Sequence, residues 1–249
     1  MLFQHSGEIW RDFPELVPGL LFAEGITPDV SVTAAVARFT ADARSRLAQG
    51  PEGELAEVQA WRRVFARMGL KPTQYRCAAE SLLRRLRTQG SLPRLHPLID
   101  LCNAISVAYA IPVAVFDVSK IAGDLEVRYA AGNEEYLTFA GEVEHPAAHE
   151  VIFADRAGRA HARRWTNRQS GLSAVQSSTS AALIVAEAMH GTASSDMRQL
   201  TEAVADELAA AWPTKPTVAI LSQRSSSFTF GPKRTGPWLT RAGAGDEHP

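Results

Sequence analysis

The sequence predicts an α+β fold, in which a helix-rich N-terminal half packs on a mixed, strand-rich middle as a single compact unit. Apolar residues recur three and four positions apart before residue 110, and after Pro112 the period becomes two. The 249 residues are 45% hydrophobic and 21% charged, which is enough to bury a full core. No fixed repeat or low-complexity linker divides them, so residues 1–234 are expected to form one domain.

The N-terminal half is predicted to be mainly helical. Residues 2–10 and 20–23 are expected to form short strands around a turn that contains Pro14 and Pro18. Amphipathic spacing and Gly or Pro stop signals then predict four helices, over residues 30–47, 52–68, 77–89 and 97–110.

Alternation of apolar and polar residues predicts strands in the middle of the chain. They are expected over residues 113–116, 125–130, 136–139, 151–154 and 160–165, with a hairpin turn at 155–158. Helices are predicted at 179–189 and 195–212, followed by a strand pair at 218–222 and 227–230. The polar tail 235–249 is expected to be disordered.

Charge and cysteine content exclude several classes of protein. The formal net charge is −1, whereas proteins that track a long stretch of phosphates are usually basic, so contact with nucleic acid must be local and DNA is not expected as a partner. Cys77 and Cys102 form neither a metal spacing nor a disulfide framework. The N-terminus lacks the apolar run of a signal peptide, and the longest uncharged stretch, 101–116, is too short for a membrane span. The cytoplasm is the expected location, with no membrane contact.

Common cofactor and hydrolase motifs do not occur in the sequence. There is no glycine-rich phosphate loop and no Gly-x-Ser-x-Gly elbow, so neither a cofactor nor a serine nucleophile is expected. His145 and His149 stand four apart beside Glu144 and Glu150, which on a helix would suggest a metal pair. Pro146 argues against that helix, so a solvated loop is preferred and no metal site is predicted.

Asp100, Asn103 and Ser106 form the first group of candidate site residues. Steps of three on an otherwise apolar helix confine these side chains to about a 120° sector. They could form an internal hydrogen-bonded network, or a row of polar groups that faces a ligand cavity.

The segment 163–170 is the second candidate. It combines three arginines with Trp165 and the amides Asn167 and Gln169 at the end of a predicted strand. Arginine binds phosphate through two hydrogen bonds, and an aromatic ring can stack on an unpaired base. Arg164 and Arg168, together with Arg84 and Arg85, are therefore candidate RNA-binding residues. A surface ion-pair cluster is the alternative.

These segments resemble, in one consistent order from residue 54 to 187, the B3/B4 domain of the phenylalanyl-tRNA synthetase beta subunit, which also occurs as freestanding proteins. The resemblance rests on Met68-Gly-Leu-Lys-Pro-Thr-Gln-Tyr-Arg76, Glu80-Ser-Leu-Leu-Arg-Arg85, Leu92-Pro93, Leu98-Ile-Asp-Leu-Cys-Asn103, Ile111-Pro-Val-Ala-Val-Phe-Asp117, Val127-Arg-Tyr-Ala130, Glu134-Glu135, Glu150-Val-Ile-Phe-Ala-Asp155, Arg164-Trp-Thr-Asn-Arg-Gln169 and Thr179.

The resemblance implies an editing function. In the synthetases, a cavity between the helical and strand-rich halves hydrolyses tyrosine wrongly esterified to phenylalanine tRNA, without a covalent nucleophile. By the family's motif, Asn103 falls at a cavity-lining position, residues 165–169 fall near the entrance, and Glu187 is the candidate for the cavity glutamate. The chain departs from the motif at Ala114, where the synthetase strand has histidine, so one imidazole donor is missing.

The function expected from the sequence is a freestanding protein that binds the aminoacyl 3′ end of a tRNA and hydrolyses a mischarged ester in trans. The catalytic residues are not assigned. The sequence shows no ATP-binding core, so it is not expected to charge tRNA itself. The alternatives are a non-catalytic module that binds RNA or an amino acid, which Ala114 favours, and a protein-interaction role for the face around Arg76, Glu80 and Arg84.

Overall fold

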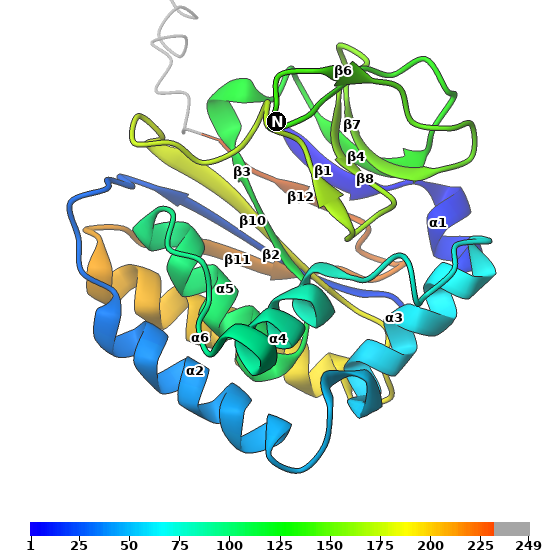
Figure 1. The fold of residues 1–249 in the computed structure, drawn as a ribbon. Coiled ribbons are helices and arrows are strands. Elements are labelled where there is room, and N and C mark those ends of the chain that lie inside the picture. The colour runs from blue at the N-terminus through cyan, green and yellow to red at the C-terminus, as the bar shows by residue number, and fades with distance from the viewer. Residues whose placement is uncertain (232–249) are drawn as a thin grey trace, which may run out of the picture.

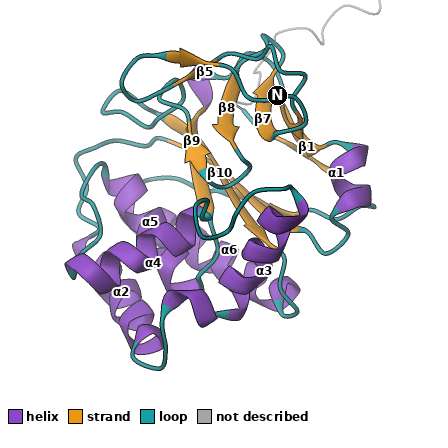
Figure 2. Cartoon of the chain, turned by 45° about the vertical axis from the view of Figure 1, so that its right-hand side comes forward, coloured by secondary structure: helices purple, strands orange, loops and turns teal. Residues whose placement is uncertain are grey.

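The computed structural model describes residues 1–231 and has three layers (Figure 1). A central sheet lies between a layer of helices and a second sheet. Figure 2 shows helices α2 to α6 gathered on one side of the molecule, whereas α1 lies beside β1. The mixed α+β fold and its single compact arrangement agree with the sequence prediction.

The central sheet has four strands in the order β11-β2-β10-β3. All neighbouring pairs are antiparallel. Its strands are β2 (Val17–Glu24), β3 (Val113–Asp117), β10 (Ala181–Ala188) and β11 (Thr217–Ile220).

The second sheet has six strands in the order β12-β1-β4-β7-β8-β9. Only β1 and β4 are parallel neighbours. The strands are β1 (Leu2–His5), β4 (Leu125–Tyr129), β7 (Val151–Asp155), β8 (Ala160–Arg163), β9 (Arg168–Gln169) and β12 (Ser227–Thr229). A small separate pair consists of β5 (Tyr136–Leu137) and β6 (Val143–Glu144).

The helices occupy two places in the fold. They are α1 (Gly7–Asp12), α2 (Thr33–Leu47), α3 (Ala56–Arg67), α4 (Ala78–Gln89), α5 (Pro97–Tyr109) and α6 (Ala193–Ala211), with short 3-10 turns at Glu52–Glu54 and Val118–Lys120. Helices α2, α5 and α6 pack on the outer face of the central sheet. Helices α1 and α3 contribute to the core between the two sheets.

The strand β10 sends alternate side chains to two different cores. Leu183 and Val185 pack between the sheets, whereas Ala182, Ile184 and Ala186 pack against the helices. Glu187 continues the first series, so its carboxylate enters the space between the sheets.

The helix predicted over residues 179–189 is wrong, because this segment is β10. A strand that is buried on both faces has a continuous apolar run, which periodicity cannot distinguish from a buried helix. Residues 7–10 of the first predicted strand belong to α1 instead, and Ser6 caps that helix by accepting a hydrogen bond from Ile9 N. The predicted pairing of 218–222 with 227–230 is also wrong, since β11 pairs with β2 and β12 with β1.

The tail predicted to be disordered, 235–249, lies outside the described residues. Within residues 1–231, no helix is both long enough and apolar enough to cross a membrane.

Candidate ligand cavity

A cavity of about 60 Å³ opens between the two sheets beside the start of α4. This is room for a few water molecules or one small side chain. It is lined by Ala78, Pro112, Val113, Ala114, Phe153, Ala162, Trp165, Thr166, Asn167, Arg168, Gln169, Val185 and Glu187.

Both sheets contribute to the apolar wall of this cavity. Ala114 on β3 is the register partner of Val185 on β10 in the central sheet. Phe153 and Ala162 are register partners on β7 and β8 of the other sheet. The position at which the resemblance expects histidine, Ala114, therefore faces the cavity as a methyl group.

Glu187 supplies the carboxylate of the cavity. The residue is only 2% exposed. Its Oε1 accepts a hydrogen bond from Trp165 Nε1 at 2.9 Å and lies 2.6 Å from His5 Nε2. No hydrogen bond within residues 1–231 uses Oε2. One carboxylate oxygen is thus fixed by the protein, and the other is free to accept from a ligand.

The loop after β8 has an unusual backbone conformation. Arg164 and Trp165 both have positive φ, at 46° and 58°. A positive φ costs conformational free energy in any residue other than glycine, and it persists where surrounding contacts hold the backbone in place. Trp165 N donates to Val151 O at 2.8 Å, and Ala78 N donates to Thr166 O at 2.8 Å. These bonds tie the loop to β7 and α4, and they direct the indole of Trp165 toward Glu187.

Two amides of the same loop use their nitrogens for structure. Asn167 Nδ2 donates to Arg76 O at 2.8 Å, and Gln169 Nε2 donates to Val115 O at 2.6 Å. Each amide keeps its carbonyl oxygen, which can only accept, and one further N–H. With Glu187 Oε2, the two amide oxygens give the cavity three acceptors for the donors of a ligand.

An ion pair behind the loop keeps it in place. Arg163 is 6% exposed and binds Glu150 through two hydrogen bonds of 2.9 Å. Burial alone would raise the pKa of Glu150, but the Arg163 guanidinium outweighs this and lowers the pKa below its ordinary value. The carboxylate is therefore charged at neutral pH and also accepts from Arg164 N at 3.0 Å.

An open groove of about 500 Å³ adjoins the cavity and shares Asn167, Arg168 and Gln169 with it. Its far side includes Tyr136, Thr138, Phe139, Ala140, Glu142 and Glu144. Phe139 is 74% exposed, which is unusual for a large apolar ring. Arg168 lies over the Tyr136 ring at 5.2 Å and pairs with Glu144 at 3.1 Å.

The structure brings together five of the residues that the sequence singled out. Trp165, Asn167, Arg168, Gln169 and Glu187 all line the cavity. Trp165 is fully buried rather than at the entrance.

The group on α5 lies elsewhere. Asp100 Oδ1 accepts from Leu95 N at 2.8 Å, and Asp100 lines a separate depression beside α2. Ser106 is fully buried and donates to Ile111 O at 2.6 Å. Asn103 is half-buried and is not among the residues that line the cavity. A ligand role for these three residues stays a prediction.

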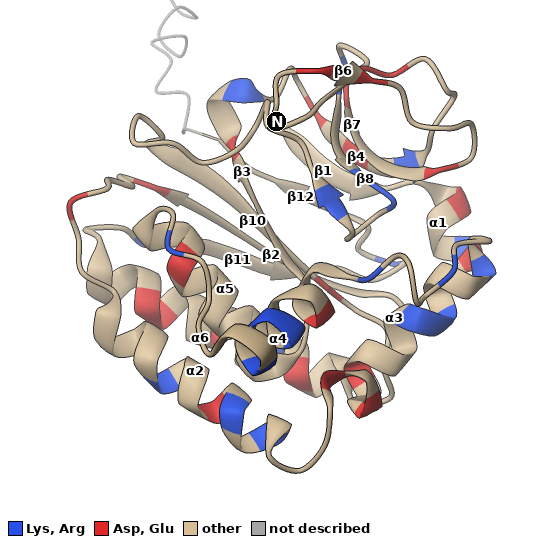
Figure 3. Ribbon diagram, viewed as in Figure 1, with Lys and Arg blue, Asp and Glu red and all other residues tan. Residues whose placement is uncertain are grey.

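The other candidate RNA-binding arginines are spread more widely. Arg164 is half-buried, with its guanidinium 4.8 Å from the Tyr75 ring centre. Arg84 and Arg85 are exposed on α4, where basic residues are visible in Figure 3. They lie six and seven residues beyond Ala78, which is about 10 Å along the helix axis.

Sequence reasoning missed His5, the residue that contacts Glu187 from β1. It is the last residue of the short strand Leu2–His5 and has no motif around it. It also missed the exposed Phe139, for which an isolated aromatic residue in a predicted strand gives no signal.

One group of side chains has the spacing of a metal site. Ligand atoms of Glu57, His190 and Asp196 lie within 4.8 Å of one another. His190 Nε2 lies 2.8 Å from Asp196 Oδ2, and Glu57 binds Arg46 at 2.7 Å. Because of these bonds, we interpret the three side chains as structural contacts around the start of α6. His145 lies in a loop, and its Nδ1 is 2.9 Å from Glu134 O.

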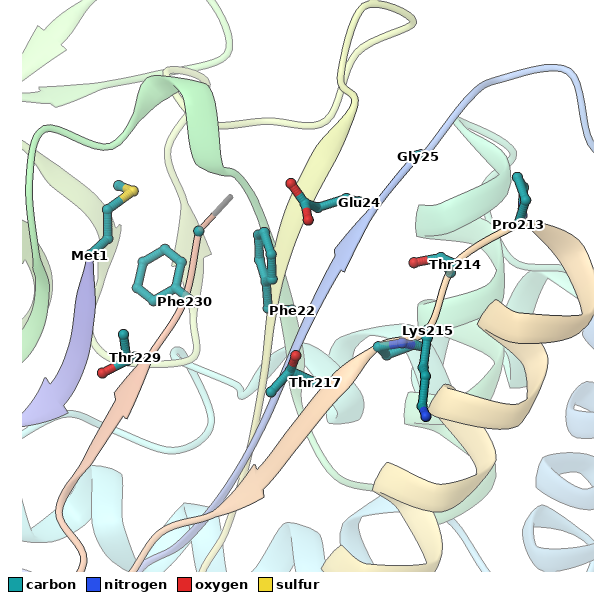
Figure 4. Close-up of a pocket in the computed structure, with 12 residues that line it drawn as sticks. Met1, Phe22, Glu24, Gly25, Pro213, Thr214, Lys215, Thr217, Thr229 and Phe230 are labelled. Atoms are coloured by element: carbon teal, nitrogen blue, oxygen red, sulfur yellow. The ribbon is translucent and has the colours of Figure 1, made fainter. Parts of the chain in front are cut away.

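A larger depression of about 1480 Å³ lies between β11, β12 and the end of β2 (Figure 4). Met1, Phe22, Glu24, Lys215 and Phe230 are among its lining residues. Gly231, the last described residue, also lines it.

A family model described as the B3/4 domain matches residues 60–206. The phenylalanine–tRNA ligase beta subunit of Legionella pneumophila (strain Lens) is 32% identical over 75 residues, which cover 30% of this chain and 9% of that protein. The corresponding subunit of Bartonella quintana is 30% identical over 94 residues, which cover 38% of this chain and 12% of that protein. The match thus spans about a tenth of these relatives.

A solved structure is also similar. It is an N-terminal fragment of the phenylalanyl-tRNA synthetase beta subunit from Pyrococcus horikoshii. The TM-score is 0.47 at 9% identity, covering 88% of this chain and 53% of that chain.

Proposed function

This chain belongs to the B3/4 domain family, and we propose that it binds the aminoacyl 3′ end of a tRNA and hydrolyses a mischarged ester in trans. The observation that carries the proposal is the free oxygen of Glu187 in a small, mainly apolar cavity. The cavity is built from residues inside the matched segment, and its adjoining groove has an exposed aromatic ring and an arginine.

The cavity suits the amino acid of such a ligand, and the adjoining groove suits its terminal nucleotide. The apolar wall would receive the amino-acid side chain, while the oxygens of Glu187, Asn167 and Gln169 would accept hydrogen bonds from its ammonium or hydroxyl groups. Arg168 and Phe139 in the groove suit the phosphate and base of the terminal nucleotide.

Hydrolysis would proceed by direct attack of water. Glu187 and Arg168 are the only ionisable side chains among the described lining residues. Burial raises the pKa of the Cys77 thiol, the nearest cysteine in the chain, to about 12, so it is not a thiolate at neutral pH. A water held by the polar groups would attack the ester carbonyl, the acyl C–O bond would break, and the ribose hydroxyl would leave with a proton.

A non-catalytic binding module is the second candidate. It is favoured by Ala114, because the methyl group lines the cavity where the resemblance expects an imidazole. Such a module would bind the same ligand and release it unchanged.

Incubation with a panel of tRNAs carrying matched and mismatched amino acids would test the proposal, with release of the amino acid as the measurement. Binding of an amide-linked analogue, which resists hydrolysis, would be followed in parallel. We expect Glu187→Gln to weaken binding or cleavage at least tenfold, because it exchanges the charged acceptor for an amide of similar shape. Glu126→Gln, in the half-exposed part of β4, is the control.

Each result has one interpretation. Cleavage that depends on Glu187 supports the editing activity. Binding without cleavage favours the second candidate. Neither binding nor cleavage of any charged tRNA would show that the proposed function is wrong.

A further inference from the structure

His5 contacts the cavity carboxylate from outside the segment that matches the family model. It is the last residue of β1, whereas the match begins at residue 60. Its Nε2 lies 2.6 Å from Glu187 Oε1, and the two residues are 182 positions apart in the chain. His5 does not line the cavity, so it lies behind Glu187 as seen by a ligand.

We propose that His5 is a positioning residue, whose Nε2–H fixes the Glu187 carboxylate so that Oε2 is presented to the ligand. The part of this inference that concerns ligand binding rests on the proposed function. The part that concerns the orientation of Glu187 is independent of the proposed function.

The chemistry of the partners assigns the direction of the bond. Trp165 Nε1 can only donate, so Glu187 Oε1 acts as an acceptor. An ionised carboxylate has no proton to give, and His5 Nε2 must then be a donor as well. Two donors converge on Oε1, and a single torsion about the carboxylate decides where Oε2 points. The arrangement thus requires the Nε2–H tautomer or the doubly protonated form of His5.

The remaining ring nitrogen of His5 fits the same assignment. Nδ1 is buried and has no hydrogen-bond partner in the described part of the chain. A neutral Nε2–H imidazole leaves only a lone pair at Nδ1, whereas a protonated ring would leave an unsatisfied donor there, which costs more. The Nε2–H tautomer therefore agrees with both the contact at Nε2 and the absence of a partner at Nδ1 in the described residues.

Aromatic packing immobilises both donors. Phe3 and Trp10 contact the His5 ring edgewise, each with a centroid distance of 5.3 Å. The indole of Trp165 is held between Phe13 at 4.8 Å and Trp61 at 5.2 Å. Because neither donor can move without repacking this core, the carboxylate is oriented before a ligand arrives.

The alternative is that the pair only stabilises the core. Two substitutions separate these roles. His5→Leu removes the donor but keeps an apolar side chain, and His5→Gln restores an N–H donor. His161→Leu is the matched control, because His161 is also fully buried, pairs with Asp155 at 3.2 Å and does not line the cavity.

The full-length variants would be compared well below their melting temperatures in the deacylation and analogue-binding assays. We expect His5→Leu to lose roughly 10- to 100-fold in ligand affinity or kcat/KM, since misplacing one group costs about this much. His5→Gln should recover most of the loss, and His161→Leu should lower Tm without the ligand effect. Equal ligand effects in His5→Leu and His161→Leu would overturn the proposal.

A spectroscopic measurement decides the question without any ligand. Nitrogen-15 NMR of the histidine rings reports which nitrogen carries the proton. We expect His5 in the Nε2–H form in the unaltered protein, and a changed resonance in Glu187→Gln but not in Glu126→Gln. A proton on Nδ1 alone would overturn the proposal. If no charged tRNA is bound while His5 shows the expected tautomer, the proposed function fails and the positioning of Glu187 stands.

Discussion

Asp155, at the end of β7, illustrates how single residues stabilise buried charge in this protein. Its carboxylate accepts hydrogen bonds from Ala122 N, Ala157 N and the backbone and guanidinium of Arg159, and it lies 3.2 Å from His161 Nε2. Burial alone would raise the pKa of Asp155, but the hydrogen bonds from His161 and Arg159 hold it well below its ordinary value. The ionised form is thus the one that the fold stabilises.

At the residue scale we predict that Asp155→Asn lowers the free energy of unfolding at pH 7 by about 1.5–3 kcal/mol, as expected for hydrogen bonds to a charged group. A carboxyl whose folded pKa is lowered stabilises the protein fully above its unfolded pKa, about 3.9, and this contribution is lost as the pH falls toward the folded pKa. The difference between variant and parent should therefore shrink below about pH 4.

Urea unfolding at pH 7 and pH 3 would measure this difference. Asp29→Asn, at an exposed position, is the control and should be nearly neutral at both pH values. A difference that is the same at pH 7 and pH 3 would contradict the prediction.

At the scale of elements, Gly19 sets the distance between β2 and α6. A Cβ atom at this position would overlap the Met197 side chain and approach Thr201 Cγ2 to 2.7 Å. The constraint is space, because Gly19 is not among the glycines with positive φ. A residue without a side chain thus lets the helix lie directly on the central sheet.

Gly19→Ala should lower the free energy of unfolding by roughly 1–3 kcal/mol, the usual cost of overpacking a core. The same substitution should cost less in a Met197→Ala background, because the obstructing side chain is then gone. Thermal or urea unfolding of the two single variants and the double variant measures this coupling. Gly7→Ala, which meets nothing within 4 Å, is the control. Additive effects would contradict the steric explanation.

At the scale of the whole molecule, β10 joins the two main cores. One core lies between the sheets, and the other lies between the central sheet and the helices. Helix α5 also leads through Pro112 directly into β3 of the central sheet. The helical and strand-rich parts therefore share buried residues through β10.

We predict that residues 1–234 unfold as one cooperative domain, because neither part can keep its core without β10. Limited proteolysis followed by mass spectrometry would test it, with cleavage after residue 235 expected first. A stable fragment ending near residue 110 would contradict the prediction.

Charge is also a property of the whole molecule. With a formal net charge of −1, only local arginines can displace counterions from RNA. We predict weak tRNA binding that falls steeply with salt. The slope of log affinity against log salt concentration should decrease in magnitude by about 1 for each phosphate-binding arginine that Arg164→Ala and Arg168→Ala remove. Binding titrations at several salt concentrations measure the slope. Arg38→Ala, on α2, is the control, and an unaltered slope in the double variant would place the RNA elsewhere.

Local patterns in the sequence were enough to predict the elements whose periodicity is regular. The helices α2, α3 and α4 each expose one face and bury another, so the sequence pattern predicted their bounds to within a few residues. The resemblance indicated Trp165, Asn167, Gln169 and Glu187, and these residues do line one cavity.

Only the tertiary structure shows which residues each buried side chain contacts. The apolar run of β10 became a strand because β2 and β3 lie on both sides of it. Asp100 and Ser106 share a helix sector but bind Leu95 and Ile111, respectively. His5 contacts Glu187, although the two residues are 182 positions apart in the sequence. Periodicity encodes that a side chain is buried, whereas the partner that it meets depends on how distant segments pack.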